Sequence, residues 1–168
     1  MFQVDAGYLM ENPGETIRLE LTGSLPPVGT GAEKIYFPEP ARVDLELTSA
    51  ENKILARGAV RAAVRVNCAR CLEPFALALD VPFEEVYYFA GKGEEEWVFF
   101  SGPEIDLTPE ITRAILLEIP MKALCREDCR GFCPDCGQNL NVQSCRCGEA
   151  KIDLRLAVLG DLFKKGVE

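Results

Sequence analysis

The first hundred residues alternate between hydrophobic and polar side chains. Hydrophobic residues occupy every second position in Thr16–Leu21 and Arg42–Thr48 and again from Ile54, which is the period of a strand with one buried face. We expect Gly58 to interrupt the third of these strands with a bulge or bend. Residues 1–14 predict a short strand or arm that ends in a proline–glycine turn.

The alternation is cleanest on the two sides of Cys68-Ala-Arg-Cys71. Every second residue is hydrophobic from Val60 to Val66 and again from Phe75 to Phe83. The sequence therefore predicts a β-hairpin that carries the cysteine pair at its tip. Arg61 and Arg65 fall on the polar face, where they form either a small basic strip or an ordinary solvated surface.

A helical period replaces the alternation after residue 105, following a short apolar strand at Trp97–Phe100. Thr108 is expected to cap the helix and Pro109 to occupy its first position. A second amphipathic helix is expected from Asp153 to Lys165. The buried stripe of the first helix and the proline that ends it are Ile111, Ile115, Ile119 and Pro120.

The order of elements is strands, a hairpin, a helix, a cysteine-rich segment and a helix. This order predicts an α+β fold with a mainly antiparallel sheet, barrel-like closure of the strands being one version of it. We expect a β-rich domain in residues 1–120, with the CxxC hairpin and the following helix. Residues 121–168 are expected to form a cysteine-rich zinc element and the C-terminal helix, and the two parts to make one compact unit.

Six of the eight cysteines lie in the 23 residues from Cys125 to Cys147. Cys133-Pro-Asp-Cys136-Gly has the form of a metal knuckle, in which two thiols three positions apart bind one ion and the glycine frees the backbone after the second. The turn-rich stretch that follows lets the chain return with two more thiols after eight residues. The predicted four-thiolate zinc site consists of Cys133, Cys136, Cys145 and Cys147.

The remaining cysteines form two further close pairs. A second zinc site built from them would join the middle of the chain to its C-terminal part, although spacing alone does not assign ligands between distant pairs. In a rival grouping, one cysteine of the later pair belongs to the C-terminal site and the hairpin pair binds no metal. The second predicted set is Cys68, Cys71, Cys125 and Cys129.

Other thiol chemistry competes with zinc. Disulfides belong mainly to short secreted chains, and the first residues show neither the basic start nor the apolar run of a signal sequence. The spacing from Cys129 to Cys136 also resembles an iron–sulfur motif of radical enzymes, which need a larger barrel than 168 residues supply. Iron in a zinc-type site is a further alternative. The hairpin pair, with Arg70 between its cysteines, would suit a redox switch, but the βαβ context of thioredoxin-like proteins is missing.

No histidine occurs in the chain, which excludes Ser-His-Asp and Cys-His nucleophiles and HExxH metalloproteases. The sequence has no phosphate-binding glycine loop and no apolar run long enough to cross a membrane. Zinc bound by four cysteines has no open coordination position, and a nuclease site at Glu94-Glu95-Glu96 is a weak alternative. We therefore expect a non-enzymatic, cytoplasmic protein.

The net charge of −9 is unevenly distributed. The first 120 residues hold 20 acidic and 10 basic side chains, whereas the remaining residues hold 7 and 8. Such acidity disfavours bulk electrostatic binding of nucleic acid. A local basic face near the cysteines is a candidate for RNA contact, although cations there also offset the charge of zinc bound by four thiolates: Arg126, Arg130, Arg146, Lys151 and Arg155.

Both cysteine segments and the helix between them resemble one family. The matching stretches are Val66–Pro74, Ile105–Leu107, Ile119–Pro120 and Cys125–Asn141. Together they resemble the bacterial YceD family, the large ribosomal RNA subunit accumulation proteins, over about residues 40–165.

The resemblance implies a role in accumulation of 23S ribosomal RNA, and hence in biogenesis of the large ribosomal subunit. It implies no established catalysis, and because some members carry fewer C-terminal cysteines, zinc serves either the function or only the stability. The partner would be a precursor of the large subunit or an assembly protein, with direct RNA contact less favoured by the net charge. The alternative from another class is a small redox or metal-responsive protein that uses Cys68 and Cys71 as a switch.

Overall fold

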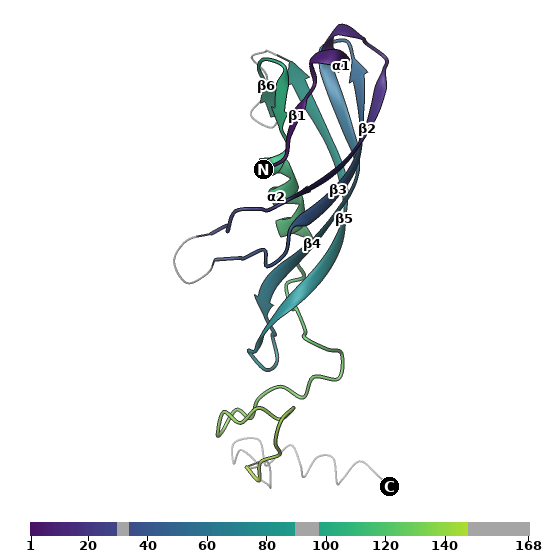
Figure 1. Ribbon diagram of the computed structural model, residues 1–168. Coiled ribbons are helices and arrows are strands. Elements are labelled where there is room, and N and C mark those ends of the chain that lie inside the picture. The colour runs from purple at the N-terminus through teal and green to yellow at the C-terminus, as the bar shows by residue number, and fades with distance from the viewer. Residues whose placement is uncertain (30–33, 90–97, 148–168) are drawn as a thin grey trace, which may run out of the picture. The chain divides into compact units, whose positions relative to one another are not determined.

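The computed structural model describes residues 1–29, 34–89 and 98–147. The chain divides into two compact units (Figure 1). The first unit consists of Met1–Cys68 and Glu73–Cys125, and the second of Ala69–Leu72 and the chain from Arg126 onward. The tip of the predicted hairpin is therefore grouped with the cysteine-rich segment.

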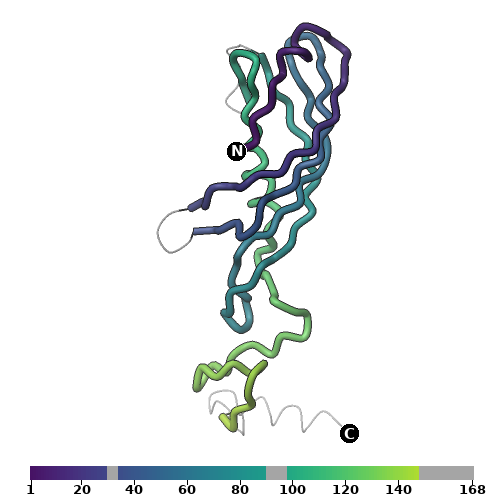
Figure 2. Tube along the Cα trace, in the orientation of Figure 1, coloured from purple at the N-terminus to yellow at the C-terminus, as the bar shows by residue number. Residues whose placement is uncertain are grey.

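An open five-stranded sheet forms the frame of the first unit (Figure 2). Its strands follow the order β2-β3-β4-β5-β6; the first three pairings are antiparallel, and β6 joins β5 in parallel. Because β2 and β6 are the two edges, the expectation of barrel-like closure is wrong, whereas the mixed α+β class is confirmed. The strands are β2 (Thr16–Gly23), β3 (Ala41–Ala50), β4 (Lys53–Asn67), β5 (Pro74–Phe89) and β6 (Val98–Phe100).

Strand β4 runs without interruption through Gly58. Its pairing with β3 sets one residue against one residue, Gly58 against Leu45, so the bulge expected here is not formed. Glycine is nevertheless required, because a Cβ atom at this position would lie 1.9 Å from the carbonyl oxygen of Asp44. The glycine thus permits a close approach of two backbones within the sheet.

The predicted hairpin between β4 and β5 is confirmed. Its ladder closes at the pair Asn67 and Pro74, and the backbone N–H of Cys68 donates to the carbonyl of Glu73 at 2.9 Å. Along β4 the side chains alternate as the sequence predicts: Val60 and Val64 are buried, whereas Arg61 and Arg65 are exposed.

A two-stranded sheet joins the N-terminus to the segment before the main helix. Strand β1 (Gln3–Asp5) pairs antiparallel with β7 (Glu104–Asp106), which confirms the short N-terminal strand. A five-residue helix, α1 (Gly7–Glu11), follows β1; it is too short for a helical period to be visible in the sequence.

Helix α2 (Thr108–Glu118) lies where its period predicts, with Ile111 and Ile115 fully buried. The expected role of Thr108 as N-cap is wrong, because Leu107 occupies that position. The Thr108 hydroxyl instead accepts a hydrogen bond at 2.9 Å from the backbone N–H of Phe2. The side chain of Asp106 accepts from the backbone N–H of Thr108 at 2.9 Å.

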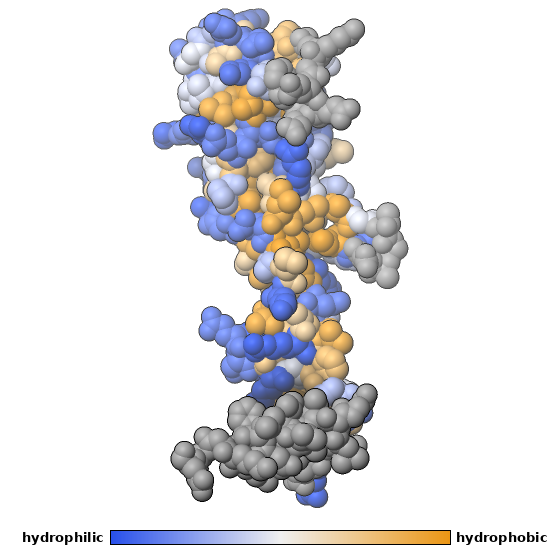
Figure 3. Space-filling model, turned by 180° about the vertical axis from the view of Figure 1, so that it is seen from behind, coloured by the Kyte–Doolittle hydropathy of each residue, from blue (hydrophilic) through white to orange (hydrophobic). Residues whose placement is uncertain are grey.

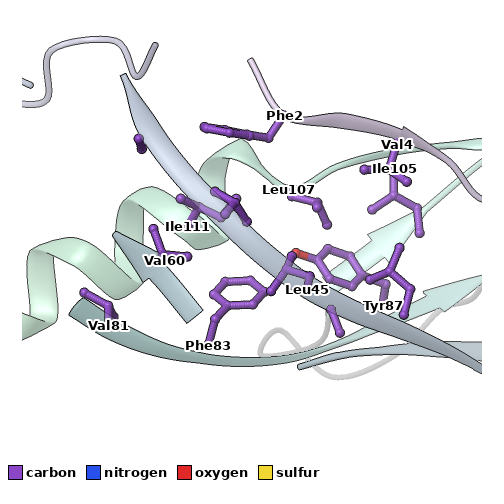
Figure 4. Packing of buried hydrophobic residues seen from close by; sticks show 14 of the residues in the cluster. Phe2, Val4, Leu45, Val60, Val81, Phe83, Tyr87, Ile105, Leu107 and Ile111 are labelled. Atoms are coloured by element: carbon purple, nitrogen blue, oxygen red, sulfur yellow. The ribbon is translucent and has the colours of Figure 1, made fainter. Parts of the chain in front are cut away.

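The hydrophobic core gathers side chains from β1, β7, α2 and the inner face of the sheet (Figure 4). Burial of this apolar surface is the main stabilising contribution to the first unit. The labelled core residues are Phe2, Val4, Leu45, Val60, Val81, Phe83, Tyr87, Ile105, Leu107 and Ile111.

The helix expected from Asp153, the acidic run at residues 94–96 and Trp97 lie outside the described residues.

Candidate metal centre

The cysteine-rich segment folds around a tight reversal of the chain. Phe132 and Asn139 form an isolated antiparallel bridge, and inside it the N–H of Cys133 donates to the carbonyl of Gln138 at 2.8 Å. The N–H of Gly137 donates back to the carbonyl of Cys133 at 2.9 Å, with Gly137 at a φ of 71°. This left-handed conformation favours glycine, and the reversal brings Cys133 and Cys136 to one side, as a metal knuckle requires.

Four thiols converge at this reversal. The Sγ atoms of the first predicted set all lie within 4.8 Å of one another. A zinc ion bound tetrahedrally by four sulfurs at about 2.3 Å holds those sulfurs about 3.8 Å apart, so the spacing fits an ion after small adjustments. The set can hold a metal, and ligation by its members stays a prediction: Cys133, Cys136, Cys145 and Cys147.

The backbone favours the thiolate form of one of these thiols. The N–H groups of Cys136 and Asp135, directed at the thiol of Cys133, lower the pKa of Cys133 to about 7. Hydrogen bonding with the Cys136 thiol, followed by burial and the charge of the neighbouring thiolates, raises the pKa of Cys147 to about 12. Four crowded thiols therefore resist full ionisation by themselves, and a divalent cation would displace the remaining protons.

The second predicted set also converges. The Sγ atoms of Cys68, Cys71, Cys125 and Cys129 lie within 4.8 Å of one another. Cys125 and Cys129 thus lie with the hairpin pair and not with the knuckle, and whether this set binds metal likewise stays a prediction. Cys68, Cys71 and Cys129 are buried, with 0%, 8% and 3% of their surfaces exposed.

Within the second unit, Arg70 fastens the hairpin tip to the segment that begins at Arg126. Its Nη1 atom donates to the carbonyl oxygens of Glu127 at 3.1 Å and Cys129 at 2.9 Å. Its own carbonyl accepts from the N–H of Phe132 at 3.2 Å. Gly131 allows this approach, because a Cβ there would lie 3.0 Å from the Arg70 carbonyl oxygen. Arg70 acts through these carbonyls in holding Cys71 near Cys129.

Sequence reasoning missed the part played by Asn141. Its carboxamide contacts Arg126, Arg130, Cys129 and Asn139. The only signal in the sequence is an asparagine in a turn-rich stretch, which does not indicate a contact with a sulfur twelve residues earlier.

The proposed basic face is partly engaged in contacts of this kind. Arg126 donates to Asn141 at 2.8 Å and pairs with Asp128 at 3.4 Å, whereas Arg130 and Arg146 are exposed. Lys151 and Arg155 lie outside the described residues. In the part of the chain that the structure describes, no helix is long and apolar enough to span a membrane.

These features define a class: an α+β protein with an open sheet and two cysteine tetrads that can hold a metal ion. The chain matches the family described as large ribosomal RNA subunit accumulation protein YceD over residues 56–163. It belongs to the YceD family.

Several curated proteins are similar to this chain. An uncharacterised protein of Mycobacterium tuberculosis is 33% identical over 142 residues, which cover 80% of this chain and 68% of that protein. The large ribosomal RNA subunit accumulation protein YCED homolog 1, chloroplastic, of Arabidopsis thaliana is 28% identical over 155 residues, 73% of this chain and 48% of its own. The uncharacterised protein YlbN of Bacillus subtilis is 30% identical over 105 residues, covering 60% and 61%. No solved structure matches the chain.

Proposed function

We propose that this chain is a non-enzymatic, zinc-binding cytoplasmic factor that supports accumulation of 23S ribosomal RNA and so biogenesis of the large ribosomal subunit. The observation that carries the proposal is the family match over residues 56–163, a range that contains all eight cysteines. The plant relatives that carry the family's name point the same way.

The donor sets support a structural metal. Four thiolates suit zinc and leave no coordination position open for a substrate or an activated water. Zinc is also favoured over magnesium or calcium, which prefer oxygen ligands. We therefore assign zinc the role of holding a binding surface in shape, with the ligands Cys133, Cys136, Cys145 and Cys147 in one site and Cys68, Cys71, Cys125 and Cys129 in the other.

The exposed face of the sheet does not favour RNA. Charges of opposite sign alternate across four strands in one register row. Arg18 pairs with Glu46 at 2.6 Å, and Arg57 pairs with Glu84 at 2.7 Å. Because these cations are already neutralised by neighbouring carboxylates, they offer little to a phosphate backbone.

A hydrophobic surface on the first unit favours a protein partner. A hollow of about 580 Å³ lies along α2, and its lining includes Pro26, Val28, Leu116 and Leu117. Figure 3 shows hydrophobic side chains gathered at the middle of the face seen from behind. Exposed patches of this kind commonly bind other proteins, so we place an assembly protein or a protein of the precursor subunit ahead of direct RNA contact.

Burial weighs against the alternative redox function. A thiol switch must reach its oxidant or its partner disulfide, and neither Cys68 nor Cys71 exposes more than 8% of its surface.

The test of the proposed function is complementation in cells that lack the endogenous gene. We expect the wild-type chain to restore the ratio of 23S to 16S ribosomal RNA and to migrate with precursor large-subunit particles at low salt. The Cys136→Ser variant should lose one zinc and fail to restore the ratio, whereas Ser144→Ala, an exposed change in the same loop, should behave as wild type. An unchanged ratio on loss of the gene contradicts the function; full rescue by a zinc-deficient Cys136→Ser chain removes zinc from it.

A further inference from the structure

The side chain of Asn141 uses all of its hydrogen-bonding capacity. Its Oδ1 atom accepts from the guanidinium of Arg126 at 2.8 Å and from the backbone N–H of Arg130 at 2.8 Å. Its Nδ2 atom donates to the sulfur of Cys129 at 3.3 Å and to Oδ1 of Asn139 at 3.0 Å. A carboxamide offers two acceptor lone pairs and two N–H donors, so each of them has a partner.

This network determines the orientation of the amide. The two groups facing Oδ1 are donors, and a nitrogen placed there would point hydrogens at hydrogens. The remaining side of the amide must therefore direct N–H groups toward the sulfur and the oxygen of Asn139. Aspartate has nearly the same shape but only acceptors, and it would place a negative charge beside the sulfur of Cys129.

Asn141 belongs to one cysteine set by sequence and contacts the other. It lies between Cys136 and Cys145, in the loop that the knuckle closes. The sulfur it contacts, Cys129, is grouped with Cys68, Cys71 and Cys125. The neighbouring backbone reinforces the link, because the N–H of Leu140 donates to the carbonyl of Gly131 at 2.9 Å.

We propose that Asn141 is a positioning residue that orients Cys129 for metal binding and thereby couples the two cysteine sets, so that metal in the knuckle strengthens metal binding at the second set. The proposal rests on the metal assignment made under the proposed function. A metal in the knuckle orders the loop that carries Asn141, and the ordered amide then donates to the Cys129 thiolate. Because coupling is reciprocal, metal in the second set strengthens binding at the knuckle by the same factor.

The expected loss of metal affinity follows from similar contacts in other metal sites. Removing a group that hydrogen-bonds to a metal ligand typically weakens metal binding by about 10- to 100-fold. The Asn141→Asp variant should therefore bind one metal with wild-type affinity and the second about 10- to 100-fold more weakly.

The experiment is a titration of the full metal-free chain with Co²⁺, followed through the sulfur-to-cobalt absorption bands. The wild type should take up two ions. The site that binds its ion more weakly in Asn141→Asp is identified by alkylating the accessible thiols and analysing the peptides by mass spectrometry. Cys125 and Cys129 should be labelled first. The matched control is Gln143→Glu, which adds the same charge to the same loop at an exposed side chain that accepts a hydrogen bond from Gln138.

A double-mutant cycle separates coupling from simple loss of structure. Cys147→Ser should weaken metal binding at the first predicted set. In the wild-type chain it should also weaken metal binding at the second set, whereas in the Asn141→Asp chain it should add little to the loss at the second set. Equal binding of both ions by Asn141→Asp and wild type overturns the role of Asn141, as does an equal loss in Gln143→Glu. A wild-type chain that binds no Co²⁺ through its thiols overturns the metal assignment itself, and this proposal with it.

Discussion

The two units of this chain differ in the residues that they bury. The first buries a continuous set of hydrophobic side chains between its sheet and α2. In the described part of the second unit, the buried residues are Cys71, Cys129, Gly131 and Cys133, whereas Phe132 and Val142 are 40% and 82% exposed. Cysteine thus occupies the positions that hydrophobic residues occupy in the first unit. The described part of this unit buries little apolar surface, so under the proposed function we expect metal binding to supply the free energy that holds its fold.

Removing the metal should give the largest difference in stability between the two units. Structural zinc contributes apparent binding free energies of about 10–16 kcal/mol in small zinc-binding peptides, so the second unit should lose its fold completely when the metal is stripped. Hydrogen exchange followed by mass spectrometry should show protection lost across 126–147 and kept in β3 and β4. Retained protection of 126–147 after verified loss of the metal would contradict the comparison.

The converse change is made in the hydrophobic core. Ile111 exposes none of its surface, and Ile111→Ala should lower the free energy of unfolding of the first unit by about 2–5 kcal/mol through lost burial and the cavity left behind. Metal content per chain should stay at its wild-type value. Urea denaturation measures the first effect and mass spectrometry of the intact holo chain the second.

Leu117→Ala is the control on the same helix. Its side chain is 80% exposed, so the substitution should change the free energy of unfolding by no more than about 0.5 kcal/mol. If Ile111→Ala also released metal, the two units would share their stability, and the contrast between them would fail.

A smaller loss of stability than that of Ile111→Ala is expected at the junction of α2 with the N-terminus. Thr108→Val removes the acceptor of the Phe2 N–H in a buried place, and an unsatisfied buried donor costs about 1–3 kcal/mol. Thr112→Val is the matched control, because the Thr112 hydroxyl donates to the Thr108 carbonyl, which also accepts within the helix. Equal urea midpoints for the two variants would show that the contact with Phe2 contributes nothing.

Several features of the fold could be predicted because their signals are local. The period of two in β2, β3, β4 and β5 depends only on neighbouring residues, and so does the helical stripe that includes Ile111 and Ile115. Each cysteine pair is likewise defined by short spacing. The grouping of the distant pairs was left open by the sequence, since no local pattern links Cys71 to Cys129.

The sequence by itself therefore determined most of the strands, the buried face of each, and helix α2. It also determined the number of cysteines and their arrangement in closely spaced pairs. The tertiary structure alone decided that the sheet stays open, with β6 added to β5 in parallel. It also decided that Thr108 binds a backbone group 106 residues away and that Asn141 contacts Cys129. These features depend on groups brought together only when the chain closes long loops, and the periodicity of a short segment carries no record of them.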